Sequence, residues 1–150
     1  MITFLRTNPE NIDFIRLISE LDKDIEIRDG EDHSFYAQFN KTDSIKNVVV
    51  AYDGDVAVGC GAFKSYKADT AEIKRMYVNP EHRGKKIAST ILQALESWAK
   101  ELSFSSCILE TGRRYPEAIV LYKKNGYAIT KNYGQYDGID DSVCFSKSLH

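Results

Sequence analysis

A strand, a short basic turn and an amphipathic helix follow one another between residues 71 and 102. The strand is expected over 71–78, and the turn runs from Asn79 to Lys86. A helix N-terminus exposes unpaired backbone N–H groups and a partial positive charge, so an anion such as phosphate can bind there. Gly84 lets the backbone approach a ligand closely, and three cations surround it: Arg83, Lys85 and Lys86. The stretch therefore predicts a strand–turn–helix unit with a pyrophosphate site at its turn.

The helix after this turn is the clearest element of the chain. Its apolar residues form one stripe at helical spacing: Ile87, Ala88, Ile91, Leu92, Leu95, Trp98, Ala99 and Leu102. Before it, two strand-like runs, 45–52 and 56–63, flank Asp53-Gly54, which is a strong hairpin signal. A helix packed beside several strands favours an α/β fold.

The other elements alternate along the whole length. Strands are expected over 2–6, 106–111, 127–133 and 142–149. Helices are expected over 10–21 after an Asn8 cap and Pro9, over 34–39, and from Pro116 to a stop at Gly126. Since there is no repeat, low-complexity tract or long linker, residues 1–150 are expected to form one α/β domain. Its sheet should be mixed and mostly antiparallel, with helices on both faces.

Composition excludes several classes of protein. A net charge of −2 over 150 residues argues against a general nucleic-acid-binding role, because no broad basic excess can replace counterions. No apolar run approaches the roughly 20 residues of a membrane span, and the N-terminus does not read as a signal peptide. The three dispersed cysteines indicate buried free thiols in a reducing compartment, and the cytoplasm is expected. The scattered histidines and cysteines form no metal-binding spacing, so no metal is expected.

Two segments, 78–88 and 118–127, together with the elements between them, resemble the GNAT superfamily of acyl-CoA-dependent N-acyltransferases. The resemblance spans essentially the whole chain. It departs from the family at the glycine turn, where the usual Gln/Arg-x-x-Gly-x-Gly/Ala falls on Glu81, Gly84 and Lys86, so that only the central glycine is kept. Tyr115 stands where many members have an asparagine, and an asparagine contact to the cofactor is therefore not expected.

The resemblance implies that acetyl-CoA, the acyl donor, binds in a gap between two splayed parallel strands, 71–78 and 106–111. Backbone groups of Met76 and Val78 would pair with the pantetheine arm, and an N–H near Met76 would polarise the thioester carbonyl. Backbone N–H groups from Arg83 to Ala88 would hold the pyrophosphate. The implied cofactor-binding residues are Met76, Tyr77, Val78, Arg83, Gly84, Lys85, Lys86, Ile87 and Ala88.

Two residues are candidates for catalysis. Tyr122 takes the position of the family's usual general acid, and a phenol, whose ordinary pKa is about 10, keeps its proton at neutral pH. Its alternative role is that of an aromatic side chain packed in the core. Glu72 is the candidate general base, and strict alternation would place it on the same strand face as Lys74, Met76 and Val78. A solvated or lysine-paired carboxylate explains Glu72 equally well, and Glu110 is a second candidate.

The function implied is direct transfer of an acetyl group from acetyl-CoA to a primary amine of a small molecule or peptide. A homodimer is common in the family. A non-catalytic acyl-CoA sensor or interaction module is the alternative, and a different nucleotide ligand is a third reading. Glu72 and Tyr122 together favour the enzyme, because a pure binding protein needs neither. The acceptor stays open, since the segments 22–44 and 131–141 that would shape its pocket contain no readable motif.

Overall fold

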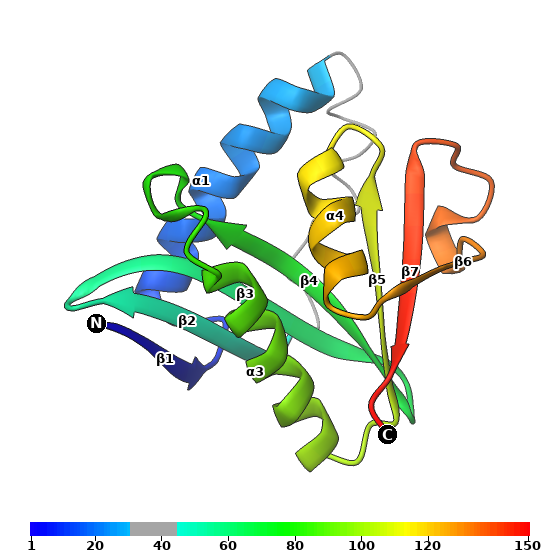
Figure 1. Ribbon diagram of the computed structural model, residues 1–150, viewed down its shortest axis with the longest axis horizontal. Helices are drawn as coiled ribbons and strands as arrows, with labels where there is room; N and C mark the ends of the chain where they lie inside the picture. The colour runs from blue at the N-terminus through cyan, green and yellow to red at the C-terminus, as the bar shows by residue number, and fades with distance from the viewer. Residues whose placement is uncertain (31–44) are drawn as a thin grey trace.

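The computed structural model describes residues 1–30 and 45–150. Within these residues, seven strands form one sheet in the order β1-β2-β3-β4-β5-β7-β6 (Figure 1). The strands are β1 (Ile2–Thr7), β2 (Asn47–Asp53), β3 (Val56–Lys67), β4 (Thr70–Val78), β5 (Ser106–Gly112), β6 (Ala128–Thr130) and β7 (Ser142–Ser148). The helices are α1 (Ile12–Asp29), α3 (Ile87–Glu101) and α4 (Pro116–Lys124), with short 3-10 turns at Pro80–His82 and Gly134–Tyr136.

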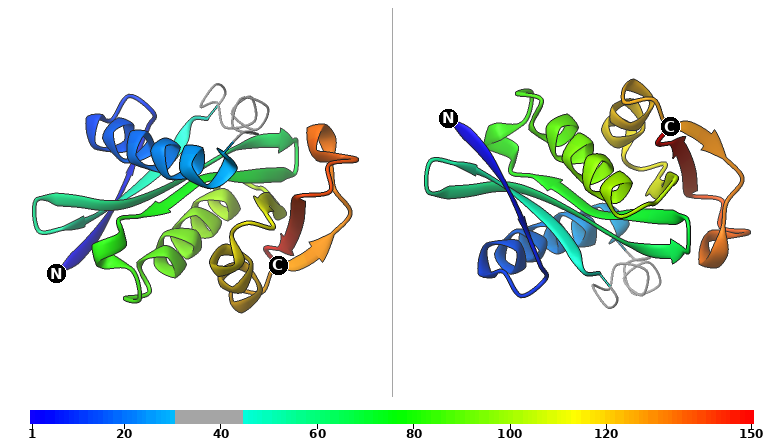
Figure 2. Two further views of the ribbon diagram at one scale, coloured as in Figure 1. Left: turned by 90° about the horizontal axis from the view of Figure 1, so that it is seen from above. Right: turned by 90° about the horizontal axis from the view of Figure 1, so that it is seen from below.

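Helices cover both faces of the sheet. Figure 2 shows α1 on one face and α3 with α4 on the other. Each face has its own apolar core: Phe14 and Leu17 of α1 pack on one side, while α3, Tyr122 and Phe145 belong to the core of the other side. Every neighbouring pair of strands is antiparallel except β4 and β5, which are parallel. The predicted fold class, a mixed and mostly antiparallel sheet between helices, is confirmed.

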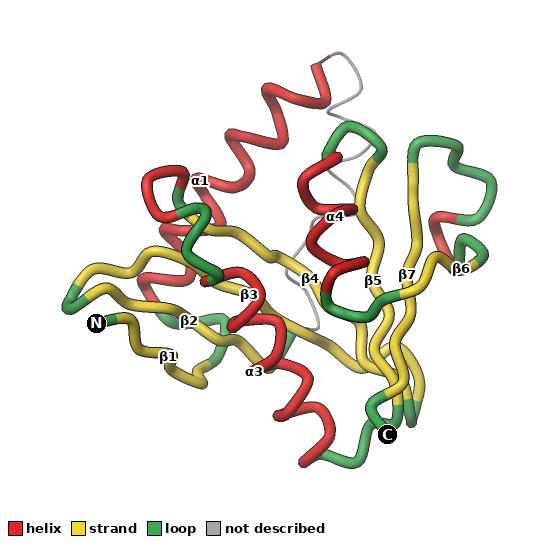
Figure 3. Tube along the Cα trace, in the orientation of Figure 1, coloured by secondary structure: helices red, strands yellow, loops and turns green. Residues whose placement is uncertain are grey.

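Several local predictions need correction. The first helix begins at Ile12 with Asn11 as its N-cap, not at Glu10. Asn8 instead accepts a hydrogen bond from the Glu10 N–H within the preceding turn. The helix also continues well past residue 21, and the predicted strand over 127–133 is reduced to β6 (Ala128–Thr130) at the edge of the sheet, as Figure 3 shows. The helix expected over 34–39 lies outside the described residues.

Two smaller expectations are met. The turn at Asp53-Gly54 joins β2 to β3, with Gly54 at a φ of 61°, a conformation that glycine adopts without strain. Cys60, Cys107 and Cys144 are all buried and unbonded to one another. Among the described helices, none is both long and apolar enough to span a membrane.

A β-bulge interrupts β4 in its middle. Ala62 of β3 is paired with Lys74, whereas Cys60 is paired with Tyr77, so that Arg75 and Met76 together face only Gly61. Arg75 adopts a left-handed conformation with a φ of 61°. The bulge reverses the alternation of side chains beyond it. Met76 therefore packs against the core under α3, whereas Arg75 reaches α1.

This bulge overturns one prediction. Strict alternation would put Glu72 on the same face as Met76 and Val78, but Val78 belongs to the core under α3 while Glu72 points to the opposite face. Glu72 is placed on the opposite face because its two neighbours on β4, Ala71 and Ile73, both belong to the core under α3.

Strands β4 and β5 separate soon after they begin. They are paired at only three positions, Thr70 with Ser106, Ala71 with Cys107 and Glu72 with Ile108. In Figure 1 the two strands leave one corner of the molecule side by side and diverge like a V, with α4 seen between them. The predicted gap between splayed parallel strands is therefore present, and it opens toward the carboxyl ends of both strands.

Two glycines of β3 let α3 approach the sheet closely. A Cβ atom at Gly61 would lie 2.5 Å from Met76 Sδ and 2.8 Å from Ile91 Cγ2, and one at Gly59 would lie 3.1 Å from Ile91 Cδ1. A glycine in a strand commonly marks such an approach. The position of α3, and with it the turn at its N-terminus, thus depends on these two residues.

We predict that Gly61→Ala lowers the free energy of unfolding by about 1–3 kcal/mol, because the added methyl group forces Met76 and α3 to move. Urea denaturation followed by circular dichroism would measure the change. Ser65→Ala, at an exposed position of the same strand, is the matched control and should stay within about 0.5 kcal/mol of the wild type. Equal stability of the two variants would contradict the close packing of α3.

Candidate active site

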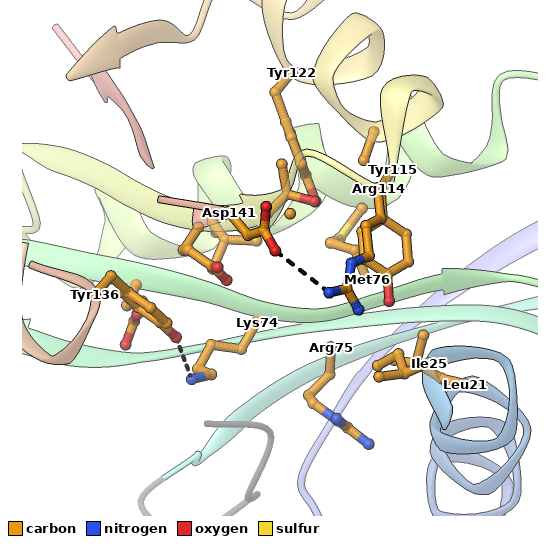
Figure 4. A pocket seen from close by; sticks show the side chains of 16 residues that line it. Leu21, Ile25, Lys74, Arg75, Met76, Arg114, Tyr115, Tyr122, Tyr136 and Asp141 are labelled. Atoms are coloured by element: carbon orange, nitrogen blue, oxygen red, sulfur yellow. Dashed lines mark hydrogen bonds and ion pairs between the residues drawn. The ribbon is translucent and has the colours of Figure 1, made fainter. Parts of the chain in front are cut away.

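A cavity of about 190 Å³ occupies the gap between β4 and β5. Figure 4 shows side chains from both strands, from α1 and α4 and from the segment before β7 converging on it. The lining residues are Leu21, Ile25, Glu72, Ile73, Lys74, Arg75, Met76, Glu110, Thr111, Gly112, Arg114, Tyr115, Ala118, Tyr122, Tyr136 and Asp141. They combine apolar, acidic and basic groups.

Tyr122 reaches the cavity from α4. Its side chain packs against Tyr127 and Phe145 in the core under α3, and its hydroxyl points into the cavity (Figure 4). Burial raises the pKa of this phenol, and the nearby negative charge of Glu110 raises it further. The phenol therefore holds its proton well above neutral pH and can serve as a proton donor.

Glu72 lies at the closed end of the gap and is only 4% exposed. The hydroxyl of Tyr133 donates a hydrogen bond to Glu72 Oε2 at 2.6 Å, and Lys64 Nζ lies 3.8 Å from Oε1. Lys64 is also the direct cross-strand neighbour of Glu72 on β3. The carboxylate is thus held between two strands and the segment that precedes β7.

Glu110 lies farther along the gap, on β5. The hydroxyl of Ser142 donates a hydrogen bond to Glu110 Oε2 at 2.7 Å. Lys74 approaches from β4, with its Nζ 3.5 Å from the hydroxyl of Tyr136. Burial lowers the pKa of Lys74, while the charges of Glu72 and Glu110 act in the opposite direction. These groups form a polar cluster on the face of the sheet that α3 and α4 leave uncovered.

The cavity therefore connects the two faces of the sheet. Cys107 and Leu109 of β5 point into the core under α3, so alternation puts Glu110 on the opposite face, together with Glu72. Tyr122 comes from the α4 side and reaches the gap from there. A group bound in the gap would accordingly meet a phenol from one face and carboxylates from the other.

Contacts that link α1 to α4 and its preceding loop lie beside the open end of the gap. Arg28 at the end of α1 forms an ion pair with Glu117, and its guanidinium lies 4.7 Å from the ring centre of Tyr115. Arg114 donates a hydrogen bond to the carbonyl of Arg28 at 3.4 Å and contacts Asp141 Oδ2 at 3.4 Å. Helices that cover opposite faces of the sheet are thereby joined at the open end of the gap.

The turn before α3 has the geometry expected of an anion site. Gly84 has a φ of 83°, and Lys86, the N-cap of α3, has a φ of 66° with no side-chain cap. Arg83 Nε donates to the carbonyl of Val78 at 2.9 Å, which fixes the start of the turn. Within the described residues, no main-chain carbonyl accepts a hydrogen bond from the N–H groups of 84–87. N–H groups without a main-chain acceptor at a helix N-terminus suit an anionic group.

The residues predicted from the sequence fall in two places. Tyr122, Glu72 and Met76 line the cavity, as does the second candidate base, Glu110. The residues from Arg83 to Ala88 form the turn and do not line it. Val78 is buried under α3, and Tyr77 is buried under α1 with the Arg83 guanidinium 5.8 Å from its ring centre.

Sequence reasoning missed part of the lining. Lys74 could have been found, because it lies two residues after Glu72 and before the bulge. Tyr136 comes from the segment that precedes β7, and Ile25 comes from the part of α1 beyond its predicted end at residue 21. Neither carries a local signal, because only the packing of distant segments brings them to the gap.

Comparison with known proteins identifies the family. Residues 13–127 match the profile of the Acetyltransferase (GNAT) family. The IAA acetyltransferase of Azospirillum brasilense is 33% identical over 151 residues, which cover 99% of this chain and 98% of that protein. A Klebsiella pneumoniae protein assigned to the acyl-CoA N-acyltransferases has a crystal structure with a TM-score of 0.84 and 30% identity, covering 100% of this chain and 99% of its own.

A third similar structure contains a bound ligand. The GNAT family acetyltransferase of Elizabethkingia anophelis, solved with acetyl-CoA bound, gives a TM-score of 0.71 at 18% identity and covers 98% of this chain and 97% of its own. The present chain belongs to the GNAT acetyltransferase family.

We predict that Lys86→Gly raises the free energy of unfolding by about 0.5–1 kcal/mol, because glycine adopts the left-handed conformation of this N-cap without a Cβ clash. Chemical denaturation would measure it. Lys85→Gly is the matched control: it removes the same charge from the same turn, but Lys85 does not have a positive φ, so no gain is expected. A gain of equal size in both variants would argue against strain at Lys86.

Proposed function

We propose that this protein is an acetyl-CoA-dependent N-acetyltransferase, which transfers the acetyl group directly to a primary amine of a small molecule or peptide. The observation that carries the proposal is the gap between β4 and β5, with the Tyr122 phenol on one side and the carboxylates of Glu72 and Glu110 on the other. Such a gap can hold a thioester between a proton donor and a proton acceptor. The three-position pairing of the strands leaves the rest of both strand edges available for a ligand.

The chain offers two features that suit coenzyme A, the carrier of the acetyl group. The N–H groups of 84–87 and the cations Arg83, Lys85 and Lys86 suit its pyrophosphate. The edge of β4 at Met76, Tyr77 and Val78 suits the amides of its pantetheine arm, which could pair as an added strand does. The bulge leaves one residue of β4 out of the regular ladder, and an N–H near Met76 would be the donor to the thioester carbonyl.

Tyr122 would act as the general acid. When the amine attacks the carbonyl carbon, the C–S bond breaks and the CoA thiolate leaves, and the phenol protonates this sulfur. Burial keeps the phenol protonated by raising its pKa, so the donor is present throughout the neutral range. A carboxylate on the other face, Glu72 or Glu110, would take the proton that the acceptor ammonium must lose before attack.

Three buried free thiols fit a reducing compartment such as the cytoplasm. The partners proposed are acetyl-CoA and the amine acceptor. The presence of both a buried phenol and carboxylates in the gap favours an enzyme over a non-catalytic acyl-CoA sensor or interaction module.

The direct test is calorimetric titration with acetyl-CoA, followed by measurement of CoA release against a panel of amines in the same buffer. Binding together with CoA release on one class of amine is the expected result. Binding of acetyl-CoA without release on any amine would favour the sensor, and no binding would overturn the proposal.

We predict that Tyr122→Phe lowers kcat by about 10²-fold or more, because the thiolate loses its proton donor, while the Kd of acetyl-CoA changes by less than about threefold. Steady-state kinetics and calorimetry would measure the two quantities. Tyr127→Phe is the matched control: Tyr127 is the aromatic neighbour of Tyr122 but donates its hydrogen bond to Glu96 outside the cavity. Unchanged turnover in Tyr122→Phe would rule out the general-acid role.

A further inference from the structure

We propose that Glu110, and not Glu72, is the base that takes the proton from the acceptor ammonium. The inference rests on the proposed function and assigns a catalytic residue within the same site. Both carboxylates line the cavity and both lie on the face opposite α3. Their positions along the gap and their hydrogen-bond partners distinguish them.

Position along the gap is the first difference. Glu72 is paired with Ile108, the last position at which β4 and β5 are joined. Glu110 lies two residues farther along β5, or about 7 Å at the rise of a strand, where the two strands have already separated. A thioester inserted between the strands would therefore lie beside Glu110, whereas Glu72 marks the closed end.

The relation to Tyr122 is the second difference. The carboxylate of Glu110 is near enough to the phenol to raise its pKa, in addition to the larger effect of burial. The base must lie near the attacking amine and the acid near the leaving sulfur, and both must reach the same carbonyl carbon. Glu110 faces Tyr122 across the gap from the opposite face of the sheet and meets this condition.

The partners of Glu72 are the third difference. Its two oxygens contact the Tyr133 hydroxyl at 2.6 Å and Lys64 Nζ at 3.8 Å. These partners belong to β3 and to the segment before β7. Glu72 thereby ties three parts of the fold together, and we assign it a positioning role. Glu110 Oε2 accepts a bond from Ser142 at 2.7 Å, which orients the carboxyl group beside the cavity.

Glu110 takes one proton from the ammonium, and the free amine attacks the carbonyl carbon to form the C–N bond. The C–S bond breaks, Tyr122 gives its proton to the thiolate, and the second proton lost by nitrogen restores the phenol. The products are the N-acetylated amine and CoA, and the proton on Glu110 passes to solvent.

The test compares Glu110→Gln with Glu72→Gln, because glutamine can accept the bonds from Ser142 and Tyr133 but is not a base. We expect Glu110→Gln to lower kcat/KM for the amine by about 10²-fold or more at pH 7 and to flatten the acid limb of the pH profile. Glu72→Gln should lose less than about tenfold and keep that limb. The reverse pattern would overturn the assignment.

The pH profile has to be read against the charged and titratable groups around Glu110. Within the described residues these include Lys74 from β4, Tyr122 from α4, Tyr136 from the Gly134–Tyr136 turn, Cys144 from β7, and Arg114 and Asp141 of the same cavity lining. Burial raises the pKa of Tyr122 and Tyr136 and raises that of Cys144 to about 11, so none of these three loses its proton on the acid side. Burial lowers the pKa of Lys74. The pH profile of Lys74→Met therefore serves as the control for a contribution from this lysine.

A second measurement needs no turnover. Protein labelled with ¹³C at the glutamate carboxyl carbons is titrated with acetyl-CoA, and the two glutamine variants assign the resonances. We expect the Glu110 resonance to move on binding and the Glu72 resonance to stay. Movement of Glu72 alone would overturn the assignment. If no amine supports CoA release in the wild type, the proposed function fails, and this titration still decides which carboxylate lies beside the thioester.

Discussion

The separation of β4 from β5 is the constraint on which the rest of this structure depends. Three paired positions hold the strands together, and the bulge at Arg75 and Met76 follows soon after the last of them. A bulge bends a strand and increases its local twist, so it carries β4 away from its neighbour. Its left-handed residue, Arg75, is held by an ion pair with Asp22 at 2.7 Å, and only 2% of its side chain is exposed. The bulged residue is thus anchored to α1 by its side chain.

The gap that results explains why the site draws on so many parts of the chain. A sheet with continuous pairing separates its two faces, whereas a gap lets groups from both faces meet. Tyr122 enters from the side of α3 and α4, while Glu72, Lys74 and Glu110 enter from the other side. The proposed proton donor and proton acceptor can therefore both reach a group bound in the gap. The ion pair between Arg28 and Glu117 joins α1 to α4 at the open end of the gap.

Much of this could be predicted from local sequence patterns. The apolar stripe from Ile87 to Leu102 predicts the position of α3, and Asp53-Gly54 predicts the hairpin between β2 and β3, because each signal lies within one element. The turn around Gly84 predicts exposed N–H groups for the same reason. The strand predicted over 71–78 is confirmed as β4, but the predicted faces of its side chains beyond Lys74 were wrong, since a bulge has no signature in the strand that contains it. It arises from packing against Gly61 of β3 and from the pairing of Arg75 with α1.

By itself, then, the sequence determined the family, the order of the elements and the turn before α3, because periodicity, capping residues and turn chemistry act over a few neighbouring residues. Only the tertiary structure decided which side chains share the cavity. Leu21, Tyr136 and Asp141 reach it from segments far apart in the chain. It also decided that Glu72 lies at the closed end of the gap and Glu110 in its open part. The register between two strands fixes that difference, and a register is a property of the pair that neither strand carries alone.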